Sequence, residues 1–204
     1  YMLVLFAGTY LYDRAMEKGL ISEGVWEQPI EDIPWFTLDD NLDFERVKQY
    51  GDRLRTHFYT HASSWARSVS LVDDPELSAF HADFLSRLAL TFSHGEYSRD
   101  ARVTQAEKTA KILFEKALSY APDSRAYLGL AMLHQKKRQF DEAMVLLKKG
   151  LSHFPGARDL SLCLGICLMN TGRFKTALTT FTPLGPAPDV DHYIRICRDR
   201  IKQD

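Results

Sequence analysis

"AYLGLAMLHQKKRQFDEAMVLLKKGLSHFP" at residues 126–155 and "LSLCLGICLMNTGRFKTALTTFTPLG" at residues 160–185 are the two stretches that decide the fold. They superpose at a constant offset of 34 residues. The matched positions carry small or large apolar residues, paired as Leu130 with Leu164, Ala131 with Gly165, Phe140 with Phe174, Ala143 with Ala177, and Leu147 with Phe181. A fixed period of this kind indicates repeated units that each bury an apolar face against the next.

The period and the residue types resemble the tetratricopeptide repeat, a pair of antiparallel helices with small residues where the two helices cross. Upstream, residues 106–122 look like the second helix of an earlier unit, whose first helix falls within 76–92 and is followed by an insertion at 93–105. Downstream, Asp189 is predicted to cap a last helix that buries Val190, Ile194, Cys197 and Ile201. A helix with one apolar and one charged face suits the end of a helical solenoid.

The resemblance implies a concave groove that binds a peptide or a neighbouring domain. Its positions fall on the first helix of each repeat, at Arg125, Leu128, Met132 and Gln135, then at Asp159, Leu162, Ile166 and Met169. Most of these residues are apolar, and the Lys and Asn set with which family members clamp a carboxylate is missing. We therefore expect the groove to hold a partner helix rather than a chaperone tail. The alternative is that it packs against another domain of the same protein or a second copy.

The other end of the chain predicts a different structure. Tyr1 to Ala7 form an apolar run without alternation, which suits a strand covered on both faces, and Gly8 and Thr9 then lead into a short helix that ends at Gly19. A strand of this kind needs neighbours that the rest of the chain does not supply. We therefore expect it to be the end of a larger α/β unit, or to pair with a second copy in a homodimer.

Residues 6–21 resemble the segment after the last strand of the radical S-adenosylmethionine barrel, where a Pro-Gly-Thr turn precedes a helix. Ala7 replaces the Pro, whereas the remaining matches keep the pattern: Gly8, Thr9, Leu11, Tyr12, Ala15, Gly19, Leu20 and Ile21. Residues 35–65, with the pair Phe58-Tyr59, resemble the helical segment after the barrel in the cobalamin-binding subgroup that contains the anaerobic magnesium-protoporphyrin monomethyl ester cyclase.

The first resemblance implies a parent enzyme that holds a [4Fe–4S] cluster and S-adenosylmethionine, and the second adds cobalamin. Phe6 and Ala7 would then border the adenine of the cofactor. The cluster-binding CxxxCxxC loop does not occur in these residues, which are expected to hold no catalytic, metal or cofactor site of their own. The expected function is a non-catalytic docking module of that enzyme. The alternative is a freestanding scaffold protein that mediates protein–protein interactions.

Composition narrows the remaining classes of function. The formal net charge is −1, which gives no support to a nucleic-acid surface, and the apolar run at the N-terminus is too short to span a membrane. Three cysteines without CxxC spacing favour reduced thiols and a cytoplasmic protein. Cys163 and Cys167, four residues apart on a helix, are interpreted as buried filler.

Two further patterns have competing interpretations. His57 and His61 have the spacing of two metal ligands on one helix, which would suit a small metal-dependent enzyme, but a solvated or core-edge pair is the plainer interpretation. Lys136, Lys137 and Arg138 are predicted to lie in the turn between the helices of one repeat, not on an RNA-binding surface.

The sequence thus predicts a mainly α-helical chain, an α-solenoid of tetratricopeptide-like helix pairs. The end of a truncated barrel is expected at 1–39, with Asp39 or Asp40 capping the next helix. A helical connector with an atypical first repeat helix is expected at 40–100, repeats at 101–185 and a capping helix at 186–204.

Overall fold

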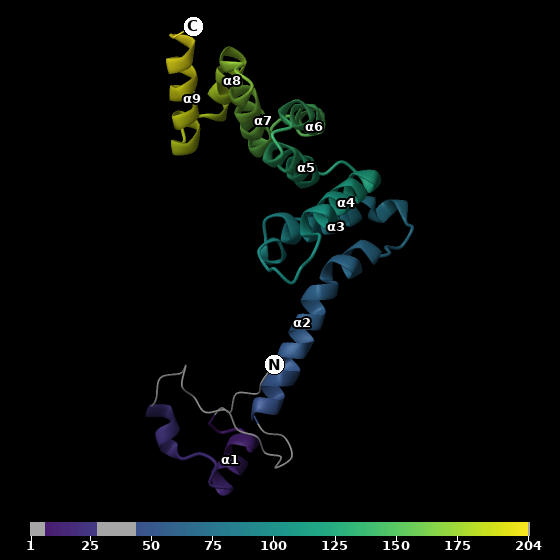
Figure 1. Cartoon of the computed structure of the whole chain (residues 1–204), viewed down its shortest axis with the longest axis vertical. Coiled ribbons are helices and arrows are strands. Elements are labelled where there is room, and N and C mark those ends of the chain that lie inside the picture. Colours follow the sequence, from purple (N-terminus) through teal and green to yellow (C-terminus); the bar gives the residue numbers. More distant parts are fainter. Residues whose placement is uncertain (1–6, 28–43, 204) are drawn as a thin grey trace. The chain divides into compact units, whose positions relative to one another are not determined.

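The computed structural model describes residues 7–27 and 44–203, and every regular element in these ranges is helical (Figure 1). The helices are α1 (Tyr10–Glu17), α2 (Phe44–Ser68), α3 (Ser78–Ser93), α4 (Ala106–Tyr120), α5 (Ser124–Lys136), α6 (Phe140–His153), α7 (Arg158–Asn170), α8 (Phe174–Phe181) and α9 (Pro188–Ile201). Short 3₁₀ turns occur at Glu23–Glu27, Pro75–Leu77, Glu96–Ser98 and Thr182–Leu184. None of the helices in the described ranges has the length and apolar character needed to cross a membrane.

The chain divides into two units, Tyr1–Phe58 and Tyr59–Asp204. In the first unit, Thr9 caps α1, because its Oγ1 accepts a hydrogen bond of 3.3 Å from the Tyr12 backbone N–H. At the other end Gly19 adopts a left-handed φ of +66°, and the backbone N–H of Leu20 donates to the Ala15 carbonyl at 2.9 Å. This is the glycine-dependent helix ending that the sequence indicates.

The N-terminal strand expected at Tyr1 to Ala7 lies outside the described residues except for Ala7, so the predicted position of Phe6 is not described either. Ala7 is described, and it lies in a turn rather than a strand. The predicted helix cap at Asp39 or Asp40 also lies outside the described residues. α2, the helix that follows it, is described from Phe44.

In the second unit, α3 pairs with α4, α5 with α6 and α7 with α8, and α9 packs on α8 (Figure 1). The first helices of successive pairs also touch, α3 with α5, α5 with α7 and α7 with α9. They therefore form one continuous row, which is the arrangement of a helical solenoid. α3 is the helix predicted within 76–92, so the insertion after it belongs to the first, atypical pair.

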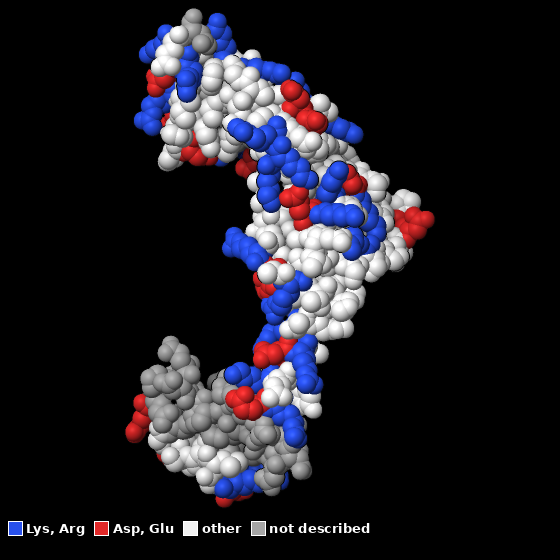
Figure 2. Space-filling view, viewed as in Figure 1, with Lys and Arg blue, Asp and Glu red and all other residues white. Residues whose placement is uncertain are grey.

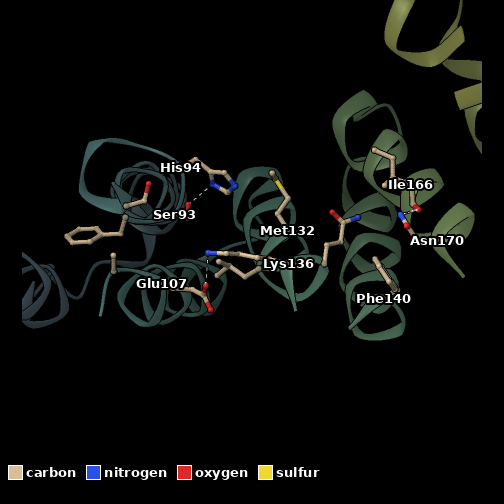
Figure 3. Close-up of a pocket in the computed structure, with 13 residues that line it drawn as sticks. Ser93, His94, Glu107, Met132, Lys136, Phe140, Ile166 and Asn170 are labelled. Atoms are coloured by element: carbon tan, nitrogen blue, oxygen red, sulfur yellow. Dashed lines mark hydrogen bonds and ion pairs between the residues drawn. The ribbon is translucent and has the colours of Figure 1, made fainter. Parts of the chain in front are cut away.

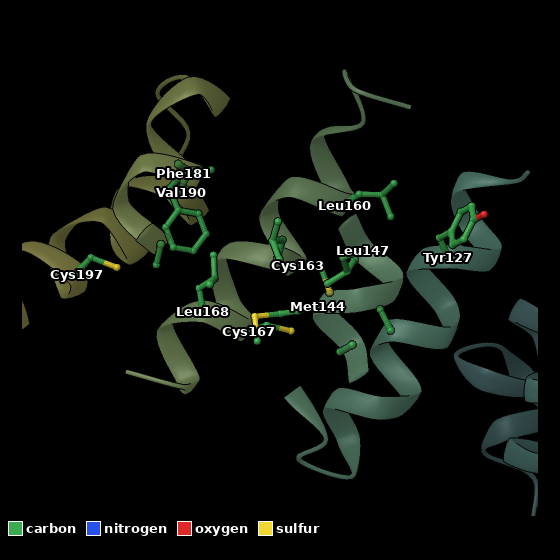
Figure 4. Close-up of a cluster of buried hydrophobic side chains, with 14 residues drawn as sticks. Tyr127, Met144, Leu147, Leu160, Cys163, Cys167, Leu168, Phe181, Val190 and Cys197 are labelled. Carbon is green, nitrogen blue, oxygen red and sulfur yellow. The ribbon is translucent and has the colours of Figure 1, made fainter. Parts of the chain in front are cut away.

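Close helix crossings depend on glycine. A Cβ placed on Gly165 would lie 2.3 Å from Cε1 of Phe181, and one on Gly129 would lie 2.1 Å from Cζ of Phe114. Phe114 and Phe181 are both fully buried, each in a separate cluster of the core. Figure 4 shows the cluster around Phe181, which spans α5 to α9. The crossing at Gly165 was predicted from the repeat, whereas that at Gly129 was not.

The insertion after α3 is held by a cluster of polar and aromatic side chains. Arg102 donates to both carboxylate oxygens of Asp100, at 2.9 and 2.5 Å, and its guanidinium carbon lies 4.2 Å from the centre of the Tyr59 ring. The Tyr59 hydroxyl donates in turn to Glu96. Hydrogen bonds from Arg102 hold the pKa of Asp100 at about 2. These contacts fix the loop to the end of α2 that belongs to the same unit.

The predicted cap of α9 is wrong by two residues. The N-cap is Ala187, and Pro188 occupies the first helical position, where its fixed φ suits a helix start. Asp189 therefore lies inside the first turn, where its carboxylate pairs with Arg158 at 3.3 Å. The predicted apolar face is confirmed in part, because Val190 and Cys197 are fully buried whereas Ile194 and Ile201 are half-buried.

Candidate partner-binding groove

The groove expected from the repeats lies on the row of first helices, where it contains a pocket of about 470 Å³ (Figure 3). Three of the predicted groove residues line it: Met132 and Gln135 from α5, and Ile166 from α7. The remaining lining residues were not predicted, and they are Phe92, Ser93, His94, Ser98, Ala106, Glu107, Leu133, Lys136, Phe140 and Asn170. Several of these come from the end of α3 and from the insertion. The 34-residue pattern does not hold there, so the repeat alignment could not predict which of these residues face the groove.

A second, smaller pocket of about 240 Å³ lies at the N-terminal ends of α5 and α7. It is lined by the predicted groove residues Arg125, Leu128 and Asp159. The other two predicted residues, Leu162 and Met169, line neither of these pockets. They are half-buried and pack against the core cluster of the second and third pairs.

Two of the three polar groove residues, Arg125 and Gln135, bind neighbouring helices of the same chain. Nη1 of Arg125 on α5 donates to Oδ1 of Asp83 on α3 at 2.5 Å. Nε2 of Gln135 donates to the Cys163 carbonyl at 3.1 Å and to Sγ of Cys167 on α7 at 2.9 Å. These side chains therefore link the first helices to one another, whereas the apolar groove positions Leu128, Met132 and Ile166 are half-buried.

One rim of the larger pocket carries charge. Glu107 on α4 pairs with Lys136 at 3.1 Å and with Lys137 at 2.8 Å, and these lysines lower the pKa of its carboxyl group. Burial of the His94 ring, together with the nearby Lys136, lowers the pKa of that imidazole. The lowered pKa favours the neutral form of this exposed imidazole, which lines the pocket.

The other candidate site residues do not assemble into a reactive centre. Burial raises the pKa of Cys163 to about 12 and raises that of Cys167 as well, so both stay protonated thiols. His57 is exposed, and the ring of His61 stacks on Trp65 at 5.7 Å. Within residues 7–27 and 44–203 there is no group of three His, Cys, Asp or Glu placed to hold a metal ion. Lys137 and Arg138 lie in the turn between α5 and α6, as predicted, whereas Lys136, also predicted in the turn, is the last residue of α5.

These features define a helical repeat domain of the tetratricopeptide-like class. A model described as the tetratricopeptide repeat matches residues 135–195. The chain is also similar to two solved structures of MamA, one of a mutant protein and one of MamA MSR-1. Both are 20% identical, with TM-scores of 0.43 and 0.42, and the alignments cover 74% and 73% of this chain and 90% and 88% of theirs. No curated protein matches the chain.

Proposed function

We propose that the helix pairs from α3 to α9 form a protein-interaction module whose groove binds an apolar segment of a protein partner. The observation that supports it most directly is the set of half-buried Leu128, Met132 and Ile166 on adjacent first helices, bordering pockets of about 470 and 240 Å³. The groove's polar Arg125 and Gln135 are already bonded within the chain. An apolar helix face that presents large side chains to such a surface would bury them without displacing these bonds.

The test is site-specific photocrosslinking in cells, followed by measurement of the affinity of the purified crosslinked partner. A benzophenone side chain is placed at Met132 in the groove or, as the control, at Val145, which is 67% exposed on α6. Met132→Glu should then weaken binding at least tenfold, because the carboxylate would lose hydration on burial. Val145→Glu should leave the affinity unchanged. Equal losses in both variants, or crosslinks from Val145 only, would show that the groove is not the binding surface.

We further propose that this module serves a radical S-adenosylmethionine enzyme of the cobalamin-binding subgroup. The support is the sequence resemblance at residues 6–21 and 35–65, together with the turn, the helix α1 and the left-handed Gly19 that the described part of the first segment contains. The [4Fe–4S] cluster, S-adenosylmethionine and cobalamin would be held outside residues 7–27 and 44–203, whose cysteines are all buried in the repeats. In that case the groove's partner includes the catalytic domain itself.

A freestanding scaffold protein accounts for the repeats equally well. The two proposals separate when the protein is purified anaerobically from its natural source and its intact mass, iron content and visible spectrum are measured. A larger, brown, iron-containing chain supports the enzyme, whereas a colourless chain without iron supports the scaffold.

Light scattering on the same sample tests the proposed homodimer. Three buried, unpaired thiols support a cytoplasmic location.

A further inference from the structure

A pocket of about 350 Å³ lies between α4 and the turn that joins α5 to α6. Its lining residues are Glu107, Lys108, Lys111, Leu130, Leu133, His134, Lys137 and Gln139. Leu130, His134 and Lys137 lie on the opposite side of α5 from the groove positions Leu128, Met132 and Gln135, since a helix advances 100° per residue. This pocket, called the lysine pocket below, therefore opens on another side of α5 than the proposed groove, although Glu107 and Leu133 line both it and the larger groove pocket.

The lysine pocket combines an apolar floor with basic walls. Leu130 and Leu133 are 4% and 7% exposed, whereas Lys108, Lys111 and Lys137 are exposed. The lining residues thus include three lysines and one carboxylate, that of Glu107. Figure 2 shows Lys and Arg side chains gathered over α4 and α5. This local excess of positive charge stands out in a chain whose formal net charge is −1.

The turn beside the pocket contains a further basic residue, Arg138, in an unfavourable backbone conformation. Arg138 has a left-handed φ of +61°, a region that side chains with a Cβ avoid. The equivalent residue 34 positions later is Gly172, with a φ of +74°. The second repeat therefore makes the same turn with the residue that suits it, whereas the first repeat has arginine next to Lys136 and Lys137.

We propose that the lysine pocket binds an acidic segment of a protein partner, with one apolar side chain on Leu130 and Leu133 and carboxylates against the lysines. The volume of about 350 Å³ accommodates one or two side chains. A nucleic acid fits less well, because a single strand needs a longer basic track and several aromatic faces for its bases, whereas no Phe, Tyr or Trp lines this pocket and His134 supplies its single aromatic ring. The site adds to the proposed groove function and does not depend on it.

Glu107 acts as the internal competitor of such a ligand. Its carboxylate pairs with Lys137 at 2.8 Å and with Lys136 at 3.1 Å in the free protein. An acidic segment would have to replace these contacts with its own. Glu107→Gln removes the competing charge and should therefore strengthen binding, a result that a purely structural role of Glu107 would not give.

The experiment uses fluorescence anisotropy with the full chain at physiological salt. The probe is a fluorescein-labelled peptide of Glu and Asp residues around a central Leu; comparison probes carry Ser in place of Leu, or Gln and Asn in place of the acids. An oligonucleotide of equal charge is the fourth probe. The acidic Leu peptide should bind most tightly. Its affinity should fall about tenfold in the double variant Lys108→Glu with Lys111→Glu and rise about threefold in Glu107→Gln.

The matched control is Lys148→Glu with Lys149→Glu on α6, which makes the same change of net charge away from the pocket and should leave the affinity unchanged. Circular dichroism confirms that each variant is folded. Arg138→Gly, which suits its backbone better than arginine, should stay folded and bind about twofold more weakly. Equal losses in the two double variants would overturn the proposal. Equal binding of the Ser probe or of the oligonucleotide would also overturn it, because either result would define a surface for any polyanion.

Discussion

The two complete repeats carry different pairs of side chains at equivalent buried positions, which makes the packing testable. In α7 and α8 the pair is Gly165 and Phe181, and 34 residues earlier it is Ala131 and Leu147. Ala131, Leu147 and Phe181 are all fully buried. A Cβ on Gly165 would lie 2.3 Å from Cε1 and 2.5 Å from Cζ of Phe181, so a methyl group fits there only if the ring is replaced by a smaller side chain.

Gly165→Ala should therefore lower the free energy of unfolding, even though alanine is the better helix former. Overpacking costs about 1–3 kcal/mol, and the 2.3 Å approach to the Phe181 ring puts this site in the upper part of that range, about 2–3 kcal/mol. Alanine recovers about 1 kcal/mol of helix propensity, so a net loss of about 1–2 kcal/mol is expected. Phe181→Leu alone should cost about 1–2 kcal/mol through the void it leaves. The double variant recreates the Ala131 and Leu147 pair, so its loss should be about 1 kcal/mol or less. The coupling energy is then about 2 kcal/mol.

The assay is urea unfolding followed by circular dichroism, with the dependence on urea concentration compared among all four proteins to check that one transition is observed. The control is the reciprocal exchange in the preceding repeat, Ala131→Gly with Leu147→Phe, which should also lose less free energy of unfolding than Leu147→Phe alone. If the losses of Gly165→Ala and Phe181→Leu simply add within about 0.5 kcal/mol, the close approach does not determine the choice of residues, and the reasoning fails.

Three further results are expected. The three cysteines should react with a thiol reagent only after unfolding, because all are buried and burial raises the pKa of Cys163 to about 12; rapid labelling of the native protein would contradict this. Arg138→Gly should raise the free energy of unfolding by about 0.5–1 kcal/mol and Gly172→Arg should lower it by about 1 kcal/mol, as measured by urea titration, since both residues have a left-handed φ. The Asp100 carboxylate should titrate with a pKa of about 2 by NMR and contribute stability above pH 3.8, its ordinary value, that is lost as the pH falls toward 2. Arg102→Ala should raise this pKa toward its ordinary value but not all the way, because the backbone N–H of residue 102 still donates to Asp100.

The repeat architecture was predictable because its cause is local and periodic. A small residue at 131 or 165 and a large one at 147 or 181 must recur wherever two helices cross in the same way, so the sequence alone reveals the period. The same logic predicts the groove positions Met132 and Ile166, which line the larger pocket; that a partner binds there stays a prediction.

What the sequence did not predict depends on contacts between distant segments. Nothing near Arg125 in the chain indicates that its partner is Asp83, 42 residues earlier. His94 lines the pocket from the end of α3, just before the insertion, which has no counterpart in the later repeats. The cap of α9 was predicted incorrectly for a local reason, because Pro188 starts the helix earlier than Asp189 alone would indicate.

Glu107 connects the two proposed binding sites. It lines both the larger groove pocket and the lysine pocket, and its partner Lys136 lines the groove pocket. An acidic segment that pairs with Lys137 in place of Glu107 would leave the Glu107 carboxylate less neutralised at the rim of the groove. Conversely, a groove ligand that moves Lys136 away from Glu107 would alter how strongly Glu107 competes for Lys137 in the lysine pocket. Such coupling must be reciprocal, so each ligand would change the affinity of the other by the same factor. Glu107→Gln, which removes the shared carboxylate, would then uncouple the two sites while leaving both surfaces in place.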